Sequence, residues 1–233
     1  MITVNNLTKK FGEKVVVDIP ELHISRGEAV GLVGNNGAGK TSFFRLILDL
    51  YQTTTGEILN HGKNVAKSEE WKDVTAAFVD NGFLIDFLTP EEYFEFLGSV
   101  RGIDKGEIKN RLEAFDKFMN GEILGKKKYI RNFSSGNKQK IGIIGAMIAQ
   151  PDILILDEPF NFLDPSSQIE IKRILKRYNA NLGTTIILSS HNLEHMVEVS
   201  NRVLLMENGK IIKDLHNENG EVEDILKSYF ETL

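Results

Sequence analysis

The stretch that most constrains this chain is the eight-residue run Gly34-Asn35-Asn36-Gly37-Ala38-Gly39-Lys40-Thr41. An apolar run, 29–33, precedes it, and a helix-like segment that begins at Ser42 follows it. A strand, a glycine-rich loop and a helix in this order direct backbone N–H groups and a helix N-terminus at a phosphate. Glycines let the backbone approach phosphate oxygens without a Cβ in the way. The sequence therefore predicts a phosphate-binding loop, with Lys40 on the β- and γ-phosphates and the Thr41 hydroxyl on Mg²⁺.

Charge and composition narrow the class of protein. With 233 residues the chain can form one large domain or two small ones. A net charge of −5 argues against a nucleic-acid partner, which usually requires a basic domain. The absence of cysteine excludes disulfides and thiolate metal sites. We find no signal-peptide pattern and no apolar run of the roughly 20 residues that a membrane-spanning helix needs. If the protein moves a solute across a membrane, another chain supplies the pore.

Strand and helix patterns alternate along most of the chain. Before residue 80, short β-rich segments such as 15–17 and 22–24 are separated by turn formers, and a buried strand is expected at 75–79. From about Pro90 to Gln150 the apolar residues recur at helical spacing instead. After that, buried strands are expected at 153–156, 184–188 and 202–206, with helices at 165–180 and 192–199. This alternation predicts an α/β chain with a mostly parallel sheet and a helical insertion in its middle third.

Two further motifs follow buried strands. Asp157 and Glu158 end the apolar run 153–156, and His191 ends the run 184–190. Ligands of open α/β sheets bind at the carboxyl ends of the strands, so the phosphate loop and these residues are expected at one edge. Asp157 is placed to hold Mg²⁺, and Glu158 to polarise an attacking water. A solvated strand end for the carboxylates and a structural histidine are the alternatives.

Between these motifs lies the segment Phe133-Ser134-Ser135-Gly136-Asn137-Lys138-Gln139-Lys140. With it, the chain resembles, over essentially its whole length, the nucleotide-binding subunit of ATP-binding cassette (ABC) transporters. That family usually has Leu-Ser-Gly-Gly-Gln here, and in this chain Ser135 replaces the first glycine and Asn137 the glutamine. The variant resembles the drug, lantibiotic and antibiotic exporter branch. The resemblance implies a RecA-like P-loop NTPase core (1–86 and 152–233) with an N-terminal antiparallel β part and an inserted helical subdomain (87–151).

The resemblance also implies a site shared between two chains. In the family, two cassettes pack head to tail, and each ATP lies between the phosphate loop of one and the signature segment of the other. Ser134, Ser135 and Gly136 would then offer donors to the γ-phosphate of the partner's ATP. The alternative for this segment is an N-capped helix without a ligand. Asp164, which follows Leu163, would help to form the dimer interface.

The resemblance also implies roles for two further positions, one for adenine and one for Mg²⁺. Phe11 falls where the family keeps an aromatic residue that stacks on adenine, although a turn aromatic that covers the sheet edge would look the same. After the strand that ends at Val79, the family usually has a glutamine on Mg²⁺ and the attacking water. This chain has Asp80-Asn81 there, so Asp80 is a candidate metal ligand. Asn81 is the alternative position for that glutamine.

Taken together, the residues and the resemblance predict a cytoplasmic ATPase subunit that binds Mg·ATP, dimerises and drives a separate membrane permease, most simply an exporter. Glu158, His191 and Lys40 are the expected catalytic residues. The apolar segment 80–93 is expected to contact the permease, unless it is tucked into the chain's own core. The rival functions are an ABC-type ATPase that acts on ribosomes or DNA, and a nucleotide-gated interaction subunit that does not hydrolyse ATP.

Overall fold

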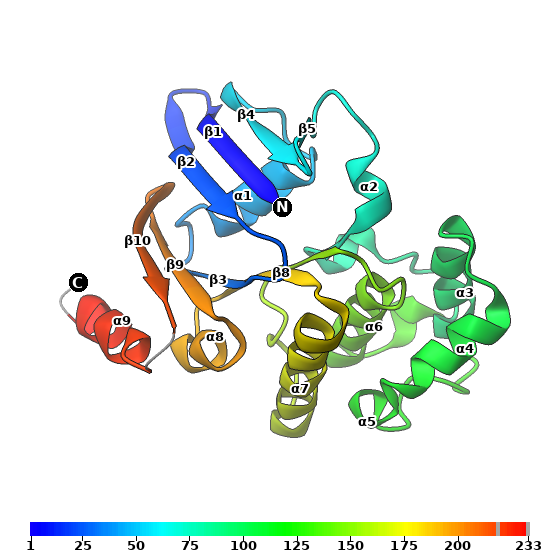
Figure 1. Cartoon of the computed structure of the whole chain (residues 1–233). Helices are drawn as coiled ribbons and strands as arrows, with labels where there is room; N and C mark the ends of the chain where they lie inside the picture. The colour runs from blue at the N-terminus through cyan, green and yellow to red at the C-terminus, as the bar shows by residue number, and fades with distance from the viewer. Residues whose placement is uncertain (218–219, 232–233) are drawn as a thin grey trace.

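The computed structural model describes residues 1–217 and 220–231, and the remaining positions of the expected 152–233 segment lie outside the described residues (Figure 1). Residues near the N-terminus form a small antiparallel sheet in the order β2-β1-β4-β5. Its strands are β1 (Ile2–Phe11), β2 (Lys14–Ile24), β4 (Thr55–Asn60) and β5 (Lys63–Asn64). The N-terminal antiparallel part that the resemblance implied is therefore present.

The larger sheet has the order β10-β9-β3-β8-β7-β6. Its strands are β3 (Ala29–Val33), β6 (Thr75–Phe78), β7 (Ile153–Leu156), β8 (Thr185–Ser190), β9 (Arg202–Glu207) and β10 (Lys210–His216). All neighbours are parallel except β9 and β10. Every residue of β3, β7 and β8 is buried, because both faces of the sheet are covered, and this explains their continuous apolar sequences.

The two faces of this sheet belong to two apolar clusters. Ile153 and Ile155 pack in a cluster with α1 and the antiparallel sheet, whereas Leu154 and Leu156 pack in a cluster with the remaining long helices. Because successive side chains of a strand point to opposite faces of the sheet, β7 packs against both apolar clusters. The helices are α1 (Lys40–Ile47), α2 (Trp71–Val74), α3 (Pro90–Val100), α4 (Lys105–Glu113), α5 (Asp116–Met119), α6 (Ser135–Met147), α7 (Pro165–Leu182), α8 (Leu193–Val199) and α9 (Val222–Glu231).

The helices α3 to α6 lie between β6 and β7 in the chain, although these two strands are neighbours in the sheet. Figure 1 shows α3, α4 and α5 in green, far from the antiparallel sheet, while α6 lies beside α7 close to the large sheet. Thr89 and Glu92 form a reciprocal capping box that fixes the start of α3 at Pro90. Within the described residues, we find no helix with the length and apolar character needed to cross a membrane.

The sequence patterns missed several boundaries and the elements β5, α2, β10 and α9. The short segments expected at 15–17 and 22–24 are one continuous strand, β2. The apolar spacing from Ile108 to Phe118 belongs to two helices, because the chain turns after Glu113 and places both side chains in one core. The alternating strand β10 and the amphipathic helix α9 were not predicted. They form at the sheet edge, where local sequence signals are weakest.

Candidate functional site

The run 34–41 forms the turn between β3 and α1 that the sequence predicted. Gly39 has φ 110° and Gly37 has φ 83°, both in the region that favours glycine. A Cβ on Gly34 would lie 2.2 Å from the Met206 carbonyl oxygen, so a side chain there would displace backbone of β9. No side chain caps the N-terminus of α1. The loop therefore presents free backbone N–H groups at a helix N-terminus, which is the arrangement that binds anions.

A cavity of about 400 Å³ opens over this loop. Its floor is formed by residues 36–42, and Glu158 lies on its wall. The other walls come from residues 14–16 of β2 and from the turn Asn208-Gly209. Its volume falls in the range of small-ligand and cofactor sites. Sequence reasoning missed residues 14–16 and the turn, because only the folded chain brings them to the loop.

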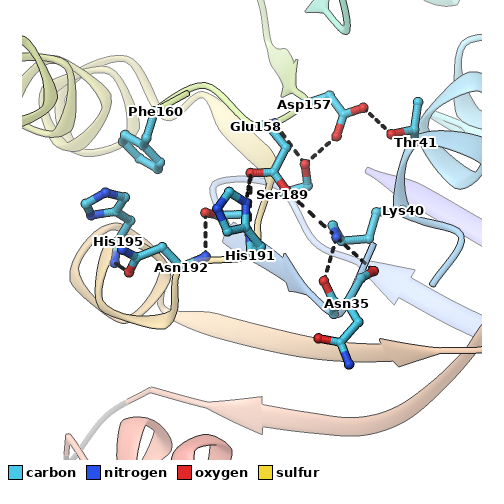
Figure 2. Close-up of polar contacts among 12 residues, drawn as sticks. Asn35, Lys40, Thr41, Asp157, Glu158, Phe160, Ser189, His191, Asn192 and His195 are labelled. Carbon is cyan, nitrogen blue, oxygen red and sulfur yellow. Dashed lines mark hydrogen bonds and ion pairs between the residues drawn. The ribbon is translucent and has the colours of Figure 1, made fainter. Parts of the chain in front are cut away.

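The carboxylate of Asp157 lies beside α1, as predicted. The Thr41 hydroxyl donates to Asp157 Oδ2 at 2.5 Å, and the Ser189 hydroxyl donates to Asp157 Oδ1 (Figure 2). Asp157 is only 8% exposed. A hydroxyl and a carboxylate are the hard oxygen donors that Mg²⁺ prefers. Ser189 also accepts from the Glu158 N–H at 2.9 Å. The sequence did not predict this role, although Ser189 belongs to the run that ends the strand before His191.

Glu158 lies between Lys40 and His191 (Figure 2). The Lys40 ammonium is buried, donates to the Gly34 carbonyl oxygen at 2.6 Å, and lies 3.8 Å from Glu158 Oε1. The other Glu158 oxygen lies 3.0 Å from His191 Nδ1. A carboxylate is thus held between a cation at the phosphate loop and an imidazole. This geometry suits a group that binds and polarises a water next to a phosphate.

The backbone of Glu158 is held in an unusual conformation. Its φ is 47°, in the left-handed region that few non-glycine residues adopt. Its carbonyl oxygen accepts from Gln139 Nε2 of α6 at 3.1 Å, and its N–H donates to Ser189. Such strain persists only where the surroundings over-determine it, and it concentrates at functional sites. Gln139 therefore links the inserted helices to the Glu158 backbone, a link that sequence reasoning did not foresee.

Asp80 is directed elsewhere than toward Thr41 and Asp157. Its carboxylate pairs with Arg45 of α1 at 3.0 Å and accepts from the Gly82 N–H at 2.7 Å. Asp80 and its neighbour Asn81 both line a small hollow with Asp157 and Glu158, but only the Asn81 Oδ1 atom is buried there without a hydrogen-bond partner. Of the two alternatives left open by the sequence, Asn81 has the free oxygen next to the carboxylates.

Phe11 and the signature segment also lie apart from the cavity over the loop. The Phe11 ring packs edge-on against Tyr51 at 5.4 Å and is not part of the cavity lining. Ser134 caps α6 by accepting from the Asn137 N–H at 3.3 Å, and Ser134 and Ser135 are exposed. Gly136 packs so closely on the next loop that a Cβ would lie 2.6 Å from the Phe162 carbonyl oxygen. Ser134, Ser135 and Gly136 are not among the residues that line the cavity over the phosphate loop.

Asp164 acts locally as a helix cap. Its carboxylate accepts from the Ser166 and Ser167 hydroxyls, both at 2.5 Å, and from the Ser167 N–H at 3.0 Å, at the start of α7. These hydrogen bonds hold the pKa of the carboxyl well below its ordinary value. The carboxylate is therefore charged at neutral pH and fixes the loop that runs from Glu158 to α7.

Comparisons with known proteins agree with this geometry. A family model described as ABC transporter matches residues 17–161. The bacitracin transport ATP-binding protein BcrA of Enterococcus faecalis is 33% identical over 219 residues, which cover 93% of this chain and 69% of that protein. A solved ATP-binding subunit of an ABC transporter superposes with a TM-score of 0.84 at 27% identity, over 98% of this chain and 93% of that one.

A second solved structure shares the fold at lower identity. It is a dimeric, post-hydrolysis state of the ATP-binding cassette MJ0796 bound to ADP and phosphate, with a TM-score of 0.83 and 22% identity. It covers 94% of this chain and all of that one. The predicted P-loop NTPase fold and the predicted family are confirmed. The chain belongs to the ABC transporter family, in which it is an ATP-binding, ATP-hydrolysing subunit.

Proposed function

We propose that this subunit dimerises around Mg·ATP, with itself or with a homologous cassette, and that hydrolysis drives a separate membrane permease that exports its substrate. The observation that carries the proposal is the convergence of Lys40, Thr41, Asp157, Glu158 and His191 at one edge of the large sheet. These side chains come from the loops after β3, β7 and β8, and together they offer what phosphoryl transfer to water requires.

The phosphates are assigned to the phosphate loop. Residues 34–42 would surround them with backbone N–H groups, and Lys40 would exchange its bond to the Gly34 carbonyl for phosphate oxygens. Thr41 and Asp157 fit a divalent cation, because a hydroxyl and a carboxylate are hard oxygen donors and the two groups lie side by side, joined by a hydrogen bond that the cation would replace. When bound with ATP, Mg²⁺ would neutralise charge on the phosphate oxygens. Asn81, with its free buried oxygen, is the candidate to extend this set rather than Asp80.

The water is assigned to Glu158. Its carboxylate is 21% exposed and stands between Lys40 and His191, so that a water on it can face the γ-phosphate. His191 would orient that carboxylate through its Nδ1 and contact the γ-phosphate. The strained backbone and the bonds from Ser189 and Gln139 hold the carboxylate in place without a cost of reorganisation during the reaction.

The second half of the site is assigned to another copy of the chain. Ser134, Ser135 and Gly136 stand at the exposed N-terminus of α6, and this end of the helix has hydrogen-bond donors suited to phosphate. A fold neighbour is described as a dimeric cassette bound to ADP and phosphate. The adenine is assigned to Phe11, whose ring is 48% exposed at the end of β1, although the Lys9 ammonium, 4.8 Å from the ring centroid, would have to move for a base to stack on that face.

The permease is assigned to the segment 80–93. Leu84 is buried and Ile85 and Leu88 are partly buried, whereas Phe83 and Phe87 are 52% and 67% exposed. The segment is thus anchored in its own core and still leaves two aromatic rings in solvent, which favours a protein partner. Through a permease the subunit would lie on the cytoplasmic face of the membrane. Export is favoured by the variant of the signature segment.

Inside-out membrane vesicles that contain the subunit and its permease test the proposal. Added ATP should load an exported substrate into the vesicles, and the variant Glu158→Gln should abolish loading. Loading only in vesicles of the opposite orientation would mean that the substrate is imported rather than exported. An isolated subunit that binds ATP but never hydrolyses it would instead support the nucleotide-gated alternative.

The contact to the permease has its own test. Phe87→Glu should leave the ATPase rate of the isolated subunit unchanged and remove its stimulation by the permease. Ile169→Glu, on the exposed face of α7, is the matched control and should change neither rate. If Phe87→Glu unfolds the subunit, or if both variants keep the stimulation, the assignment of this segment is wrong.

A further inference from the structure

Residues 126–131, in the segment before α6, concentrate positive charge on an acidic chain. Lys126, Lys127, Lys128 and Arg131 lie within six residues, and all four side chains are exposed. The whole chain has a net charge of −5. Within the residues that the structure describes, none of these four cations forms an ion pair with a carboxylate. Positive charge that is gathered without a counter-charge attracts an anionic partner, and the function proposed above makes no use of it.

Aromatic rings accompany these cations. Tyr129 is 45% exposed, and the Arg131 guanidinium lies 5.2 Å from the centroid of its ring. The Lys128 ammonium lies 4.1 Å from the centroid of the Phe133 ring. Ile130, in contrast, is fully buried and anchors the segment in the apolar core of the inserted helices. A tyrosine among lysines and an arginine, on an anchored surface, is typical of segments that lie at the headgroup level of a membrane.

The segment continues the surface that we assign to the permease. The Ile130 N–H donates to the Leu88 carbonyl oxygen at 2.8 Å, and the Arg131 N–H donates to the Asp86 carbonyl oxygen at 3.1 Å. Phe87, which is 67% exposed, therefore lies in the strip of chain next to the cations. A subunit that docks on a membrane protein through that surface would turn the cations toward the same membrane.

We propose that residues 126–131 form a basic patch that binds the anionic phospholipid headgroups of the membrane. The proposal goes beyond the proposed function, because the contact is with lipid and needs no permease. Three of the four cations are lysines, whose ammonium groups are point charges on flexible stems. They suit a diffuse layer of phosphate groups, whereas a fixed carboxylate of a protein is better matched by the planar fork of arginine.

The contact is expected to be electrostatic and reversible. Each lysine or arginine close to an anionic surface raises the affinity about fivefold. Salt screens such charges beyond about 8 Å at physiological ionic strength, so the patch has to lie against the headgroups. The basic patch would therefore orient the subunit on the membrane and leave firm attachment to a protein partner.

Cosedimentation of the nucleotide-free chain with lipid vesicles tests the basic patch. Mixed vesicles of phosphatidylglycerol and phosphatidylcholine should bind the wild-type chain, and vesicles of phosphatidylcholine alone should not. The triple variant Lys126→Gln, Lys127→Asn and Lys128→Gln should bind the mixed vesicles about a hundredfold more weakly, because three fivefold contributions are lost. Asparagine is chosen at Lys127 because the backbone there has φ 48°, which asparagine tolerates.

The matched control neutralises three exposed lysines elsewhere that form no ion pair within the described residues, Lys10→Gln, Lys67→Gln and Lys117→Gln. It changes the net charge by the same amount and should bind almost as the wild type does. Equal binding by the two triple variants would overturn the proposal, and so would wild-type binding to phosphatidylcholine alone.

Two further outcomes would reassign the partner and overturn the proposal as well. If the wild type does not bind the mixed vesicles, the cations serve an acidic protein segment instead. If inorganic phosphate at the concentration of the headgroups releases the chain, the patch binds a free anion. Since the vesicles contain no permease, all of these outcomes leave the proposed function untouched.

A fluorescence measurement tests the same contact without removing any charge. The chain has one tryptophan, Trp71, which is 6% exposed and lies outside the basic patch. Tyr129→Trp places a second fluorophore within the patch. Its emission should shift to shorter wavelength with the mixed vesicles, and brominated phosphatidylcholine in them should quench it. An unchanged spectrum at saturating lipid would overturn the contact, even if the triple variant fails to fold.

Discussion

At the carboxyl edge of the large sheet, the proposed ATP site is assembled from side chains that bind one another. Lys40, Asp157, Glu158 and His191 come from three different loops, and Thr41 and Ser189 join them through hydrogen bonds. At the N-terminus of α6 the situation is the opposite. Ser134 bonds within the first turn of its own helix and is exposed.

The difference follows from how the two regions are supported. The sheet edge rests on strands that are buried along their whole length, so its side chains are ordered before any ligand arrives. The α6 terminus belongs to a helical insertion, and Gln139 connects that insertion to the Glu158 backbone. One region is ordered within a single chain, and the other is an exposed set of donors that we assign to the phosphate of a second copy. The predictions below test this comparison, starting with the largest expected effect.

Glu158→Gln should lower ATP turnover by about 10²–10⁴-fold, the usual contribution of a group that handles the reacting proton. ATP affinity should persist, because the phosphates are held by the loop and by Lys40. Steady-state ATPase assays and an ATP titration measure the two effects. A variant that keeps most of the wild-type turnover would remove Glu158 from the catalytic role.

Lys40→Ala should weaken ATP binding by about 10- to 100-fold, because the ammonium makes charge-assisted bonds to the bound phosphates. The rate should fall as well, since the same contacts stabilise the transition state. Lys14→Ala, on the wall of the same cavity, is the control and should have a much smaller effect. Unchanged affinity in a titration of Lys40→Ala would contradict the phosphate-loop assignment.

Ser134→Ala tests the α6 terminus against a second capped helix of the insertion. Loss of the cap should cost about 1 kcal/mol of unfolding free energy. Asp104→Ala removes the exposed cap of α4 and should cost a similar amount. Only Ser134→Ala should also lower turnover, because only Ser134 is assigned to a phosphate. Equal turnover in the two variants would leave Ser134 as a helix cap and nothing more.

The smallest effect concerns His195, whose ring packs on Phe160 at 4.6 Å (Figure 2). Burial, with a contribution from Lys172, lowers the pKa of His195, although Glu194 and Glu198 oppose the shift. The fold therefore favours the neutral ring. Its contribution to stability is complete above the ordinary histidine pKa of about 6.5 and is lost as pH falls below it.

His195→Gln should accordingly reduce the loss of unfolding free energy between pH 7.5 and pH 5.5, with an effect smaller than that of removing a helix cap. Denaturant unfolding at the two pH values measures it. His61, whose pKa burial also lowers, should supply part of the remaining dependence. If the variant and the wild type lose the same stability, His195 does not contribute.

The sequence was most informative where a motif coincides with the end of a buried strand. The phosphate loop, Asp157-Glu158 and His191 were predicted correctly as neighbours, because parallel strands bring their carboxyl ends to one edge. The direction of Asp80 could not be predicted, since it depends on Arg45, which reaches it from α1. The left-handed backbone of Glu158 was also missed, because no glycine marks it.

The central claim is that each ATP site is divided between two chains. The chain contains no cysteine, so Asn35→Cys and Ser135→Cys can be introduced singly into the Glu158→Gln protein and then mixed with a short thiol-reactive cross-linker. We expect a covalent dimer in the mixture with Mg·ATP, but not with ADP and not from either variant alone. Two results would contradict the account. One is the absence of a cross-link in the mixture with Mg·ATP, and the other is a cross-link that forms only within a single chain, in a further variant that carries both cysteines.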